Sequence, residues 1–292
     1  MADTHFQRLG LIVKPELALA LNGVKRIMQW GKKNSVEILA NNKTAGLLKT
    51  RGFDDDELVK MADGLIVLGG DGTLLGAARL ATAESLPLLG INLGSLGFIT
   101  EVAFDEIEES LDKLISGDYT IEERMMADLK ISNAKDSGSN TALNDIFFSR
   151  KSTMKMIELS ISVNGHHVSA YRADGLIIST PTGSTAYALS AGGPILYPLL
   201  DSLLICPICP HTLTNRPIVI PGDSIIDIDF AAGQEGIIAT LDGQVYIDIN
   251  ENDRLTVGRS DRVTRFIKVP DRTHYDTLRS KLGWGGKTTS ND

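Results

Sequence analysis

A short glycine-rich stretch offers the first chemistry in this sequence. Gly69-Gly70-Asp71-Gly72-Thr73 lies between an apolar run at 65–68 and a helical pattern at 73–83. Glycines let backbone N–H groups approach a ligand, and N–H groups at the start of a helix bind phosphate. Asp71 is unusual there, because a carboxylate repels phosphate unless it binds a cation or takes a proton. Taken alone, the stretch fits equally well a phosphate site and a tight turn in which Asp71 only caps the helix.

Two widespread phosphate motifs do not account for this stretch. The Walker A string G-x-x-x-x-G-K-[ST] does not occur in the sequence. The dinucleotide fingerprint G-x-G-x-x-G fails because, after Gly70 and Gly72, the next glycine is Gly76, one position late.

A second block is rich in small and hydroxyl residues. It reads STPTGSTAYALSAGGP at 179–194. The small residues let a ligand lie against the backbone, and Ser184, Thr185 and Ser190 supply hydrogen-bonding groups. Tyr187 offers an aromatic face to a base. A loop with only a structural role rarely needs so many hydroxyls between glycines, so we interpret this block as a ligand-binding segment.

The composition is that of an ordinary globular chain. Of its residues, 42% are hydrophobic and 23% are charged. A length of 292 residues is enough for two domains. The net charge of −8 argues against a nucleic-acid partner. The first residues, MADTHFQRLG, lack a signal pattern and no run approaches a membrane span, so we expect a cytoplasmic protein without a membrane partner.

The two cysteines do not form a framework of disulfides. Cys206 and Cys209, followed by His211, have the spacing of half a metal site, but no second pair follows. We therefore expect no metal held by the protein at these residues.

The first 120 residues alternate between apolar runs and helical patterns. Strands are predicted at 9–13, 36–40, 65–68 and 86–92, and helices at 18–30, 56–62, 73–83 and 105–116. This alternation is typical of a parallel sheet covered by helices on both faces. We expect a Rossmann-like α/β domain at 1–120.

From about residue 121 the pattern changes to consecutive strands. They are predicted at 127–132, 144–149, 157–163 and 168–173. Asn164-Gly165 and Asp242-Gly243 stand between such runs and predict β-hairpins. We expect an antiparallel β domain at 121–265, after which residues 274–284 return to helical spacing.

Together these motifs resemble the NAD kinase family. The resemblance rests on GGDGT at 69–73, Asn144-Asp145, Asp174-Gly175 and TPTGSTAYALSAGGP at 180–194, and it continues at 210–220 and 277–284. GGDG alone also occurs in lipid and phosphofructokinase-type kinases, whereas the hydroxyl-rich block is highly specific. The resemblance implies an N-terminal α/β domain, a C-terminal β domain and a final segment, 266–292, whose helix returns to the first domain.

The resemblance also implies a reaction, in which the γ-phosphoryl of ATP moves to the 2′-hydroxyl of the adenosine ribose of NAD and gives NADP. Asp71 is then the expected base, with Gly72 against the dinucleotide. Gly69, Gly70, Gly72 and Thr73 are expected at the ATP phosphates. A divalent metal, Mg²⁺, is expected with ATP and would be held largely by phosphates and water. Family members are usually homo-oligomers, so a dimer or tetramer is expected.

Further NAD contacts follow from the same resemblance. Asn144 and Asp145 match the family's Asn-Glu pair, although Asp145 is one methylene shorter. Arg172 is also expected to favour NAD over NADH, because members with Arg at this place tend to reject NADH. The expected contacts besides Asp71, Gly72 and this pair are Lys155, Arg172, Asp174, Thr182, Thr185, Ala186, Tyr187, Ala188, Leu189, Ser190 and Gln244.

Two rival functions stay open from the sequence. A diacylglycerol-type lipid kinase would share GGDGT but would need an apolar acceptor groove, whereas the block at 180–194 is polar. A non-catalytic dinucleotide sensor would keep that block but would have no use for a base at Asp71. The expected function is an ATP-dependent NAD kinase.

Overall fold

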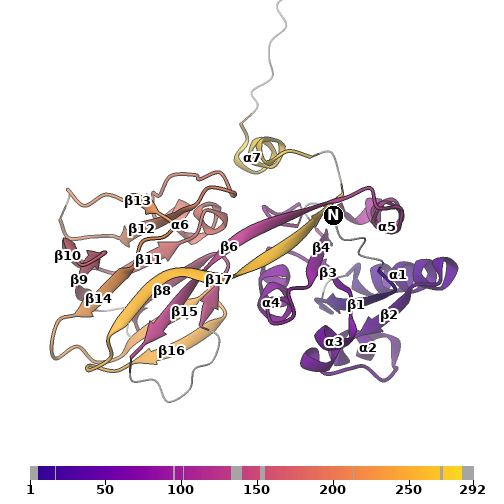
Figure 1. Ribbon diagram of the computed structural model, residues 1–292, viewed down its shortest axis with the longest axis horizontal. Helices are drawn as coiled ribbons and strands as arrows, with labels where there is room; N and C mark the ends of the chain where they lie inside the picture. The colour runs from indigo at the N-terminus through magenta and orange to yellow at the C-terminus, as the bar shows by residue number, and fades with distance from the viewer. Residues whose placement is uncertain are drawn as a thin grey trace, which may run out of the picture. The chain divides into compact units, whose positions relative to one another are not determined.

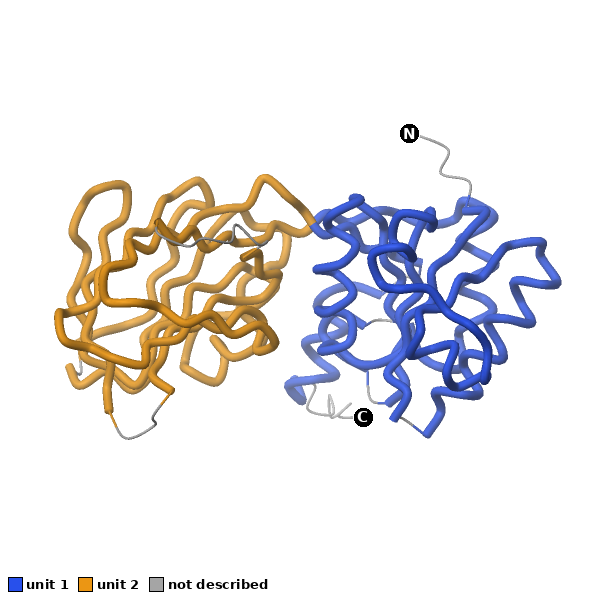
Figure 2. Tube along the Cα trace, turned by 90° about the horizontal axis from the view of Figure 1, so that it is seen from below, with its two compact units in different colours: residues 1–123, 264–292 blue, residues 124–263 orange. Residues whose placement is uncertain are grey.

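The computed structural model describes residues 6–16, 18–94, 96–100, 102–132, 140–151, 155–212, 214–269 and 272–284. The chain forms two compact units (Figure 2): unit 1 is Met1–Glu123 with Thr264–Asp292, and unit 2 is Arg124–Val263. The chain passes from one unit to the other within two paired strands, β6 (Thr120–Ile131) and β17 (Leu255–Lys268).

Unit 1 is built on a parallel sheet with the strand order β2-β1-β3-β4, extended by the end of β17. Its strands are β1 (Arg8–Val13), β2 (Glu37–Ala40), β3 (Gly64–Gly69), β4 (Pro87–Asn92) and the short β5 (Val102–Ala103) beside β4. The pairings are parallel throughout. Every residue of β3 and β4 is buried, as expected for strands between two layers of helices. The predicted parallel sheet is confirmed.

Helices cover both faces of this sheet (Figure 1). On one face, Leu9 of β1 shares an apolar core with residues of α1 and α5. The other face carries α3 and α4. Gly10 of β1 points to α3, since a Cβ at this glycine would lie 3.2 Å from Leu58, and α3 in turn contacts α4. The helices are α1 (Ala20–Asn34), α2 (Asn42–Leu48), α3 (Asp55–Met61), α4 (Asp71–Ala81) and α5 (Ile107–Ser116), which follows a 3-10 turn, η1 (Phe104–Glu106).

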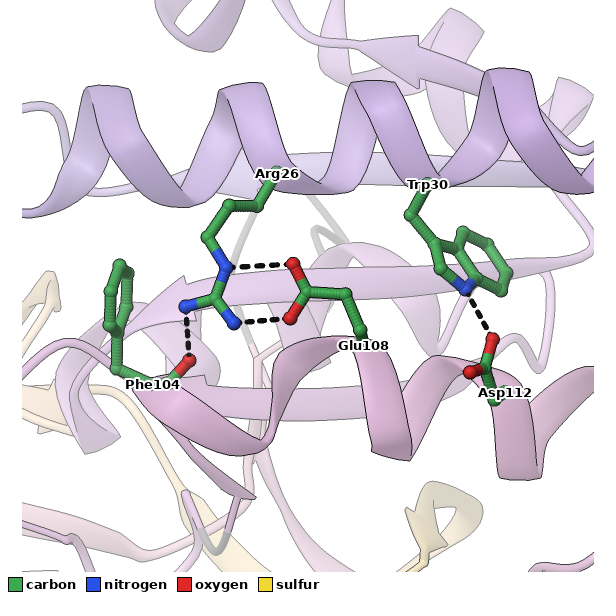
Figure 3. A network of polar contacts seen from close by, with 5 residues as sticks. All are labelled: Arg26, Trp30, Phe104, Glu108 and Asp112. Carbon is green, nitrogen blue, oxygen red and sulfur yellow. Dashed lines mark hydrogen bonds and ion pairs between the residues drawn. The ribbon is translucent and has the colours of Figure 1, made fainter.

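A polar network ties α1 to α5 (Figure 3). The Arg26 guanidinium donates twice to the Glu108 carboxylate and once to the Phe104 carbonyl, at 2.9 Å. It also lies 4.8 Å from the centre of the Phe104 ring. One turn further along α1, the Trp30 indole N–H donates to Asp112 at 2.7 Å. The hydrogen bonding between Arg26 and Glu108 raises the pKa of the first and lowers the pKa of the second.

The helices of unit 1 differ from the sequence prediction in one additional helix and in their boundaries; α1, predicted at 18–30, spans Ala20–Asn34. The short helix α2 was not predicted; it is stabilised by Asn41, whose side chain accepts a bond from the Thr44 N–H at 2.9 Å. Helix α4 begins at Asp71, two residues before the predicted start. The carboxylate of Asp71 in its first turn suits the positive end of the helix dipole, which outweighs the low helix propensity of Gly72.

Unit 2 contains two antiparallel sheets. One has the order β13-β12-β11-β8-β15-β16, and the other has β10-β9-β14-β17, with β6 beside β17 and β7 beside β6. The remaining strands are β7 (Thr141–Ala142), β8 (Asp145–Arg150), β9 (Ile157–Val163), β10 (His166–Ala173), β11 (Gly175–Ser179), β12 (Ser202–Ile208), β13 (Ile218–Pro221), β14 (Ile226–Phe230), β15 (Ile237–Leu241) and β16 (Val245–Ile249). The predicted antiparallel β domain is confirmed.

The sheets of unit 2 share one apolar core, to which Ile146 and Leu176 contribute from one sheet and Ile161 and Ile228 from the other. Both predicted hairpins are present. Asn164 and Gly165 (φ 52° and 77°) join β9 to β10, and Asp242 and Gly243 (φ 52° and 67°) lie between β15 and β16. Asn, Asp and Gly tolerate these left-handed conformations, which explains the success of the hairpin signals.

The last helix, α7 (His274–Leu282), belongs to unit 1, as the family resemblance implied. Thr273 caps it by accepting a bond from the Asp276 N–H, and Leu278 is buried. Within the described residues, no helix is long and apolar enough to cross a membrane.

Candidate active site

The turn from β3 into α4 depends on close backbone packing. A Cβ at Gly69 would lie 2.4 Å from the Thr73 hydroxyl oxygen, so only glycine fits there. The Thr73 N–H donates to the Gly70 carbonyl at 3.0 Å. Gly72, the second helical residue, is exposed. This turn therefore brings the five residues of the GGDGT motif together at the carboxyl end of β3, where parallel sheets bind ligands.

The carboxylate of Asp71 holds a neighbouring loop. Its Oδ2 accepts a bond from the Phe98 N–H at 2.8 Å. Its Oδ1 accepts three bonds, from the N–H groups of Ile99 (3.3 Å) and Thr100 (3.1 Å) and from the Thr100 hydroxyl (2.9 Å). The alternative in which Asp71 only caps its own helix is therefore wrong. The loop fixes the direction of the carboxylate, and Asp71 stays partly exposed.

The loop that meets Asp71 was not predicted from the sequence. A Cβ at Gly97 would lie 1.9 Å from Asp71 Oδ1, so this position requires glycine. Asn92, the last residue of β4, donates to the Thr100 hydroxyl at 2.8 Å. The available signal was a second glycine-containing segment, NLGSLGFIT at 92–100, directly after a buried strand. Because β3 and β4 are parallel neighbours, their carboxyl ends lie at the same edge of the sheet.

In unit 2, Asn144 and Asp145 lie where β8 begins. Asn144 is half-buried, whereas Asp145 is only 5% exposed. Burial, and in second place the negative charge of Asp242, raises the pKa of Asp145 to about 7. A carboxyl group with this pKa exists in both protonation states near neutral pH, so it is able to donate or to accept a hydrogen bond.

The hydroxyl-rich block forms a 3-10 turn, η2 (Thr182–Thr185), and a single helical turn, α6 (Tyr187–Ser190). It packs on the outer face of the six-stranded sheet, where Ala188 and Leu196 contact Leu204 and Cys206. The Cys206 thiol lies 3.9 Å from the Ala188 carbonyl oxygen. The apolar residues of the sheet therefore support the block from beneath.

The block divides into exposed and buried parts. Tyr187 is 45% exposed, and its ring meets Phe147 edge-on with centroids 5.2 Å apart. Ser190 is exposed, and Thr185, Ala186 and Leu189 are half-buried, whereas Ala188 is buried. An exposed aromatic ring fixed by a second ring suits the stacking of a base.

Several hydroxyls of the block are used inside the protein, among them those of Ser184 and Thr182. Ser184, which was expected to offer its hydroxyl to a ligand, is fully buried. It donates to the Pro181 carbonyl at 2.7 Å and accepts from the Leu196 N–H at 2.9 Å, so its role is structural and the expectation was wrong. Thr182 is 4% exposed, and its hydroxyl accepts a bond from Arg124 at 3.3 Å.

The other predicted contacts are exposed side chains of unit 2. Arg172 forms a cross-strand ion pair with Glu158 (3.4 Å), in which both side chains are more than half exposed. Asp174 lies between β10 and β11, and Gln244 follows the Asp242-Gly243 turn. Lys155 is exposed and precedes β9.

Metal ligands were not expected from the protein alone. Among the residues that the structure describes, no group of three His, Cys, Asp or Glu side chains could hold a metal ion. Cys206 is buried and Cys209 is exposed. Burial raises the pKa of the Cys206 thiol to about 11, so this thiol is a poor metal ligand and nucleophile.

Known protein families match both units of this chain. The family model of the ATP-NAD kinase N-terminal domain matches residues 9–119, and that of the C-terminal domain matches residues 143–269. An NAD kinase of Magnetococcus marinus is 41% identical over 284 residues, covering 94% of this chain and 93% of the relative. An NAD kinase of Geobacter metallireducens is 42% identical over 260 residues, covering 89% and 92%.

Solved structures also resemble the chain along almost its whole length. Yeast NADH kinase complexed with NADH is 26% identical with a TM-score of 0.86, covering 98% of this chain and 89% of the other. An NAD kinase from Archaeoglobus fulgidus in complex with ATP is 28% identical with a TM-score of 0.78, covering 96% and 100%.

Proposed function

The chain belongs to the NAD kinase family and is an ATP-dependent NAD kinase, and from this premise we propose roles for its residues. In the reaction, the 2′-hydroxyl oxygen of the adenosine ribose of NAD forms a bond to the γ-phosphorus of ATP. The bond from that phosphorus to the β–γ bridging oxygen breaks, ADP leaves, and the hydroxyl loses its proton. The protein must therefore position two substrates and accept one proton.

Asp71 accepts that proton. Its two oxygens are not equivalent, because Oδ1 already accepts three hydrogen bonds and Oδ2 accepts one. A carboxylate oxygen has two lone-pair sites, so Oδ2 is the oxygen with room for a substrate hydroxyl. The loop at 98–100 holds the carboxylate in one direction, which is what a general base requires. This uneven bonding is the observation that carries the assignment.

The start of α4 receives phosphate groups of ATP. Gly69, Gly70, Gly72 and Thr73 surround the first helical turn, where N–H groups and the helix dipole favour anions. The relative from Archaeoglobus fulgidus was solved with ATP. Support from this chain comes from Gly72, which is exposed and has no side chain to keep a phosphate away.

Unit 2 supplies most of the proposed NAD contacts. Tyr187 offers its ring to a base, and the half-buried Asn144 offers an amide that both donates and accepts. Asp145 contributes through a carboxyl group that donates or accepts near neutral pH. The remaining contacts are Gly72 of unit 1 and, in unit 2, Lys155, Arg172, Asp174, Thr182, Thr185, Ala186, Ala188, Leu189, Ser190 and Gln244. Of these, Thr182 and Ala188 are the two that the fold buries, at 4% and 0% exposure.

Kinases that use ATP generally depend on a divalent metal, and we assign Mg²⁺ to this protein. Mg²⁺ keeps most of its ligands as water and phosphate oxygens. This preference fits a chain whose described residues contain no cluster of three metal-binding side chains. The metal would offset phosphate charge next to Asp71.

The protein acts in the cytoplasm as a homo-oligomer, a dimer or a tetramer. The oligomer assignment rests on the family, whose members are usually homo-oligomers. Sedimentation of the purified protein at several concentrations measures its mass, and a 31.5 kDa species throughout would contradict it.

The function is tested by incubating the purified protein with ATP and Mg²⁺ and with either NAD or diacylglycerol. NADP should form only in the first mixture, and a chelator should stop its formation. A folded sample that makes no NADP above a protein-free control would refute the kinase function. Phosphorylated diacylglycerol would instead support the lipid-kinase rival, which the family match does not favour.

A further inference from the structure

The backbone at the start of β8 is held by hydrogen bonds from both sides. On one side lies the carboxylate of Asp242, which is 98 residues away from Asn144 in the sequence. Its Oδ2 accepts from the Leu143 N–H (3.1 Å), and its Oδ1 accepts from the N–H groups of Asn144 (2.7 Å) and Asp145 (3.3 Å). The Asp242 N–H donates back to the Asp145 carbonyl at 3.0 Å.

On the other side lies the first part of the hydroxyl-rich block. The Thr180 hydroxyl donates to the Leu143 carbonyl at 2.6 Å, and the Thr180 N–H donates to the Asn144 carbonyl at 2.9 Å. Ser179 adds a hydroxyl donor to the same Asn144 carbonyl at 3.2 Å. A Cβ at Gly183 would lie 2.0 Å from that oxygen, so the block reaches it only because residue 183 is glycine.

All six backbone polar groups of Leu143, Asn144 and Asp145 therefore have a partner. Most buried backbone groups have partners, but here the side chains of Asp242 and Thr180 supply them for four of the six groups, three N–H groups through Asp242 and one carbonyl through Thr180. Residues held in this way by neighbouring side chains are well placed to present their own side chains to a ligand. Asp242 and Thr180 are both buried, at 9% and 0% exposure, so neither is placed to meet a ligand with its side chain. Their side chains act on the segment between them.

We propose that Asp242 and Thr180 are positioning residues for NAD binding, because together they fix the backbone from which Asn144 and Asp145 reach the dinucleotide. This inference rests on the proposed role of Asn144 and Asp145 in that binding. It assigns a function to two residues that were not among the expected ligand contacts, although Thr180 is the first residue of the motif at 180–194. It also explains why a turn residue, Asp242, is buried and accepts three bonds.

The variants are chosen so that the fold is kept. Asp242→Asn retains a residue that tolerates φ 52° but replaces one acceptor oxygen by an NH₂ group, which cannot accept from a backbone N–H. Thr180→Val keeps the shape of the side chain and removes its hydroxyl, whereas Thr180→Ser keeps the hydroxyl. The matched control is Asn164→Ala, because Asn164 is also a hairpin residue at φ 52° that accepts one backbone bond, from Ile225 at 2.8 Å.

The measurements are the KM for NAD, the KM for ATP, kcat and the melting temperature. Asp242→Asn and Thr180→Val should each raise the KM for NAD about tenfold, the effect of one well-placed hydrogen bond lost to the ligand. The KM for ATP should stay within about twofold, and Thr180→Ser should bind NAD like the parent protein. Asn164→Ala should lower the melting temperature without changing the KM for NAD.

The proposal is overturned if Asp242→Asn and Thr180→Val lower the melting temperature as the control does and leave the KM for NAD unchanged. If Asp242→Asn does not fold, the comparison of Thr180→Val with Thr180→Ser decides alone. Asn144→Ala separates this inference from the proposed function. If the parent protein makes NADP but Asn144→Ala has a normal KM for NAD, the role of Asn144 is wrong and the positioning role falls with it.

Discussion

Replacing Asp71 by Asn removes the group that we propose as the base, and it also disturbs the loop that holds this group. With the amide oxygen in place of Oδ1, three of the four bonds are kept and the Phe98 N–H loses its acceptor. A hydrogen bond to a charged group contributes about 1.5–3 kcal/mol, and this one, at a partly exposed residue, belongs at the lower end. Loss of a general base should lower kcat by about 10²–10⁴-fold.

The assay measures initial rates of NADP formation at saturating NAD and ATP, together with the free energy of unfolding in urea. The matched control is Thr100→Val, which removes the hydroxyl bond to Asp71 Oδ1 (2.9 Å) and the bond from Asn92 to that hydroxyl (2.8 Å), and leaves the carboxylate in place. Because Thr100→Val loses two hydrogen bonds and Asp71→Asn loses one, we expect the control to lose at least as much stability. In the control, kcat should fall less than about tenfold, because the base is still present.

Two results would refute this reasoning. An Asp71→Asn protein that keeps more than about one-tenth of the parent kcat has lost no essential base. If kcat falls equally in Asp71→Asn and Thr100→Val, the carboxylate serves to hold the loop at 98–100 and does not accept the proton.

Three further predictions follow from the environments of single residues. Because the folded protein raises the pKa of Asp145 to about 7 from 3.8, its ionisation opposes folding; this penalty is absent below about pH 4, grows up to about pH 7 and is constant above. Asp145→Asn should therefore be more stable than the parent at pH 8, by a few kcal/mol at most. The free energy of unfolding in urea is measured for both proteins at pH 5 and pH 8, and an equal change between the two pH values in parent and variant would contradict this. Arg172→Gly should reduce the preference of kcat/KM for NAD over NADH by about tenfold or more, since steric exclusion is commonly worth about 10–200-fold, and an unchanged ratio shows that Arg172 does not set it. Arg26→Met should lower the free energy of unfolding by about 1–2 kcal/mol through loss of the bidentate pair with Glu108, with no change in the KM for either substrate; a changed KM would mean that the contact between α1 and α5 affects the site.

The local features of this protein were determined by the sequence. The turn from β3 into α4 follows from an apolar run that ends in glycines, and the hairpins at Asn164-Gly165 and Asp242-Gly243 follow from residues that tolerate positive φ. The hydroxyl-rich block at 179–194 likewise forms a continuous segment of two short helical turns, in which Tyr187 is exposed. Each of these features depends on residues that are close in the sequence, so a local sequence pattern is enough to predict it.

Only the tertiary structure decided which polar groups meet across the chain. Asp71 meets Thr100 because β3 and β4 are parallel neighbours, and Asp242 meets Asn144 because β15 pairs with β8 in one register. Ser184 shows the same limit, since its type suggested a ligand contact but its burial gave it partners within the protein. A side chain's partners depend on strand order and register, and these are set by the packing of the whole core, so residue types and their spacing do not record them.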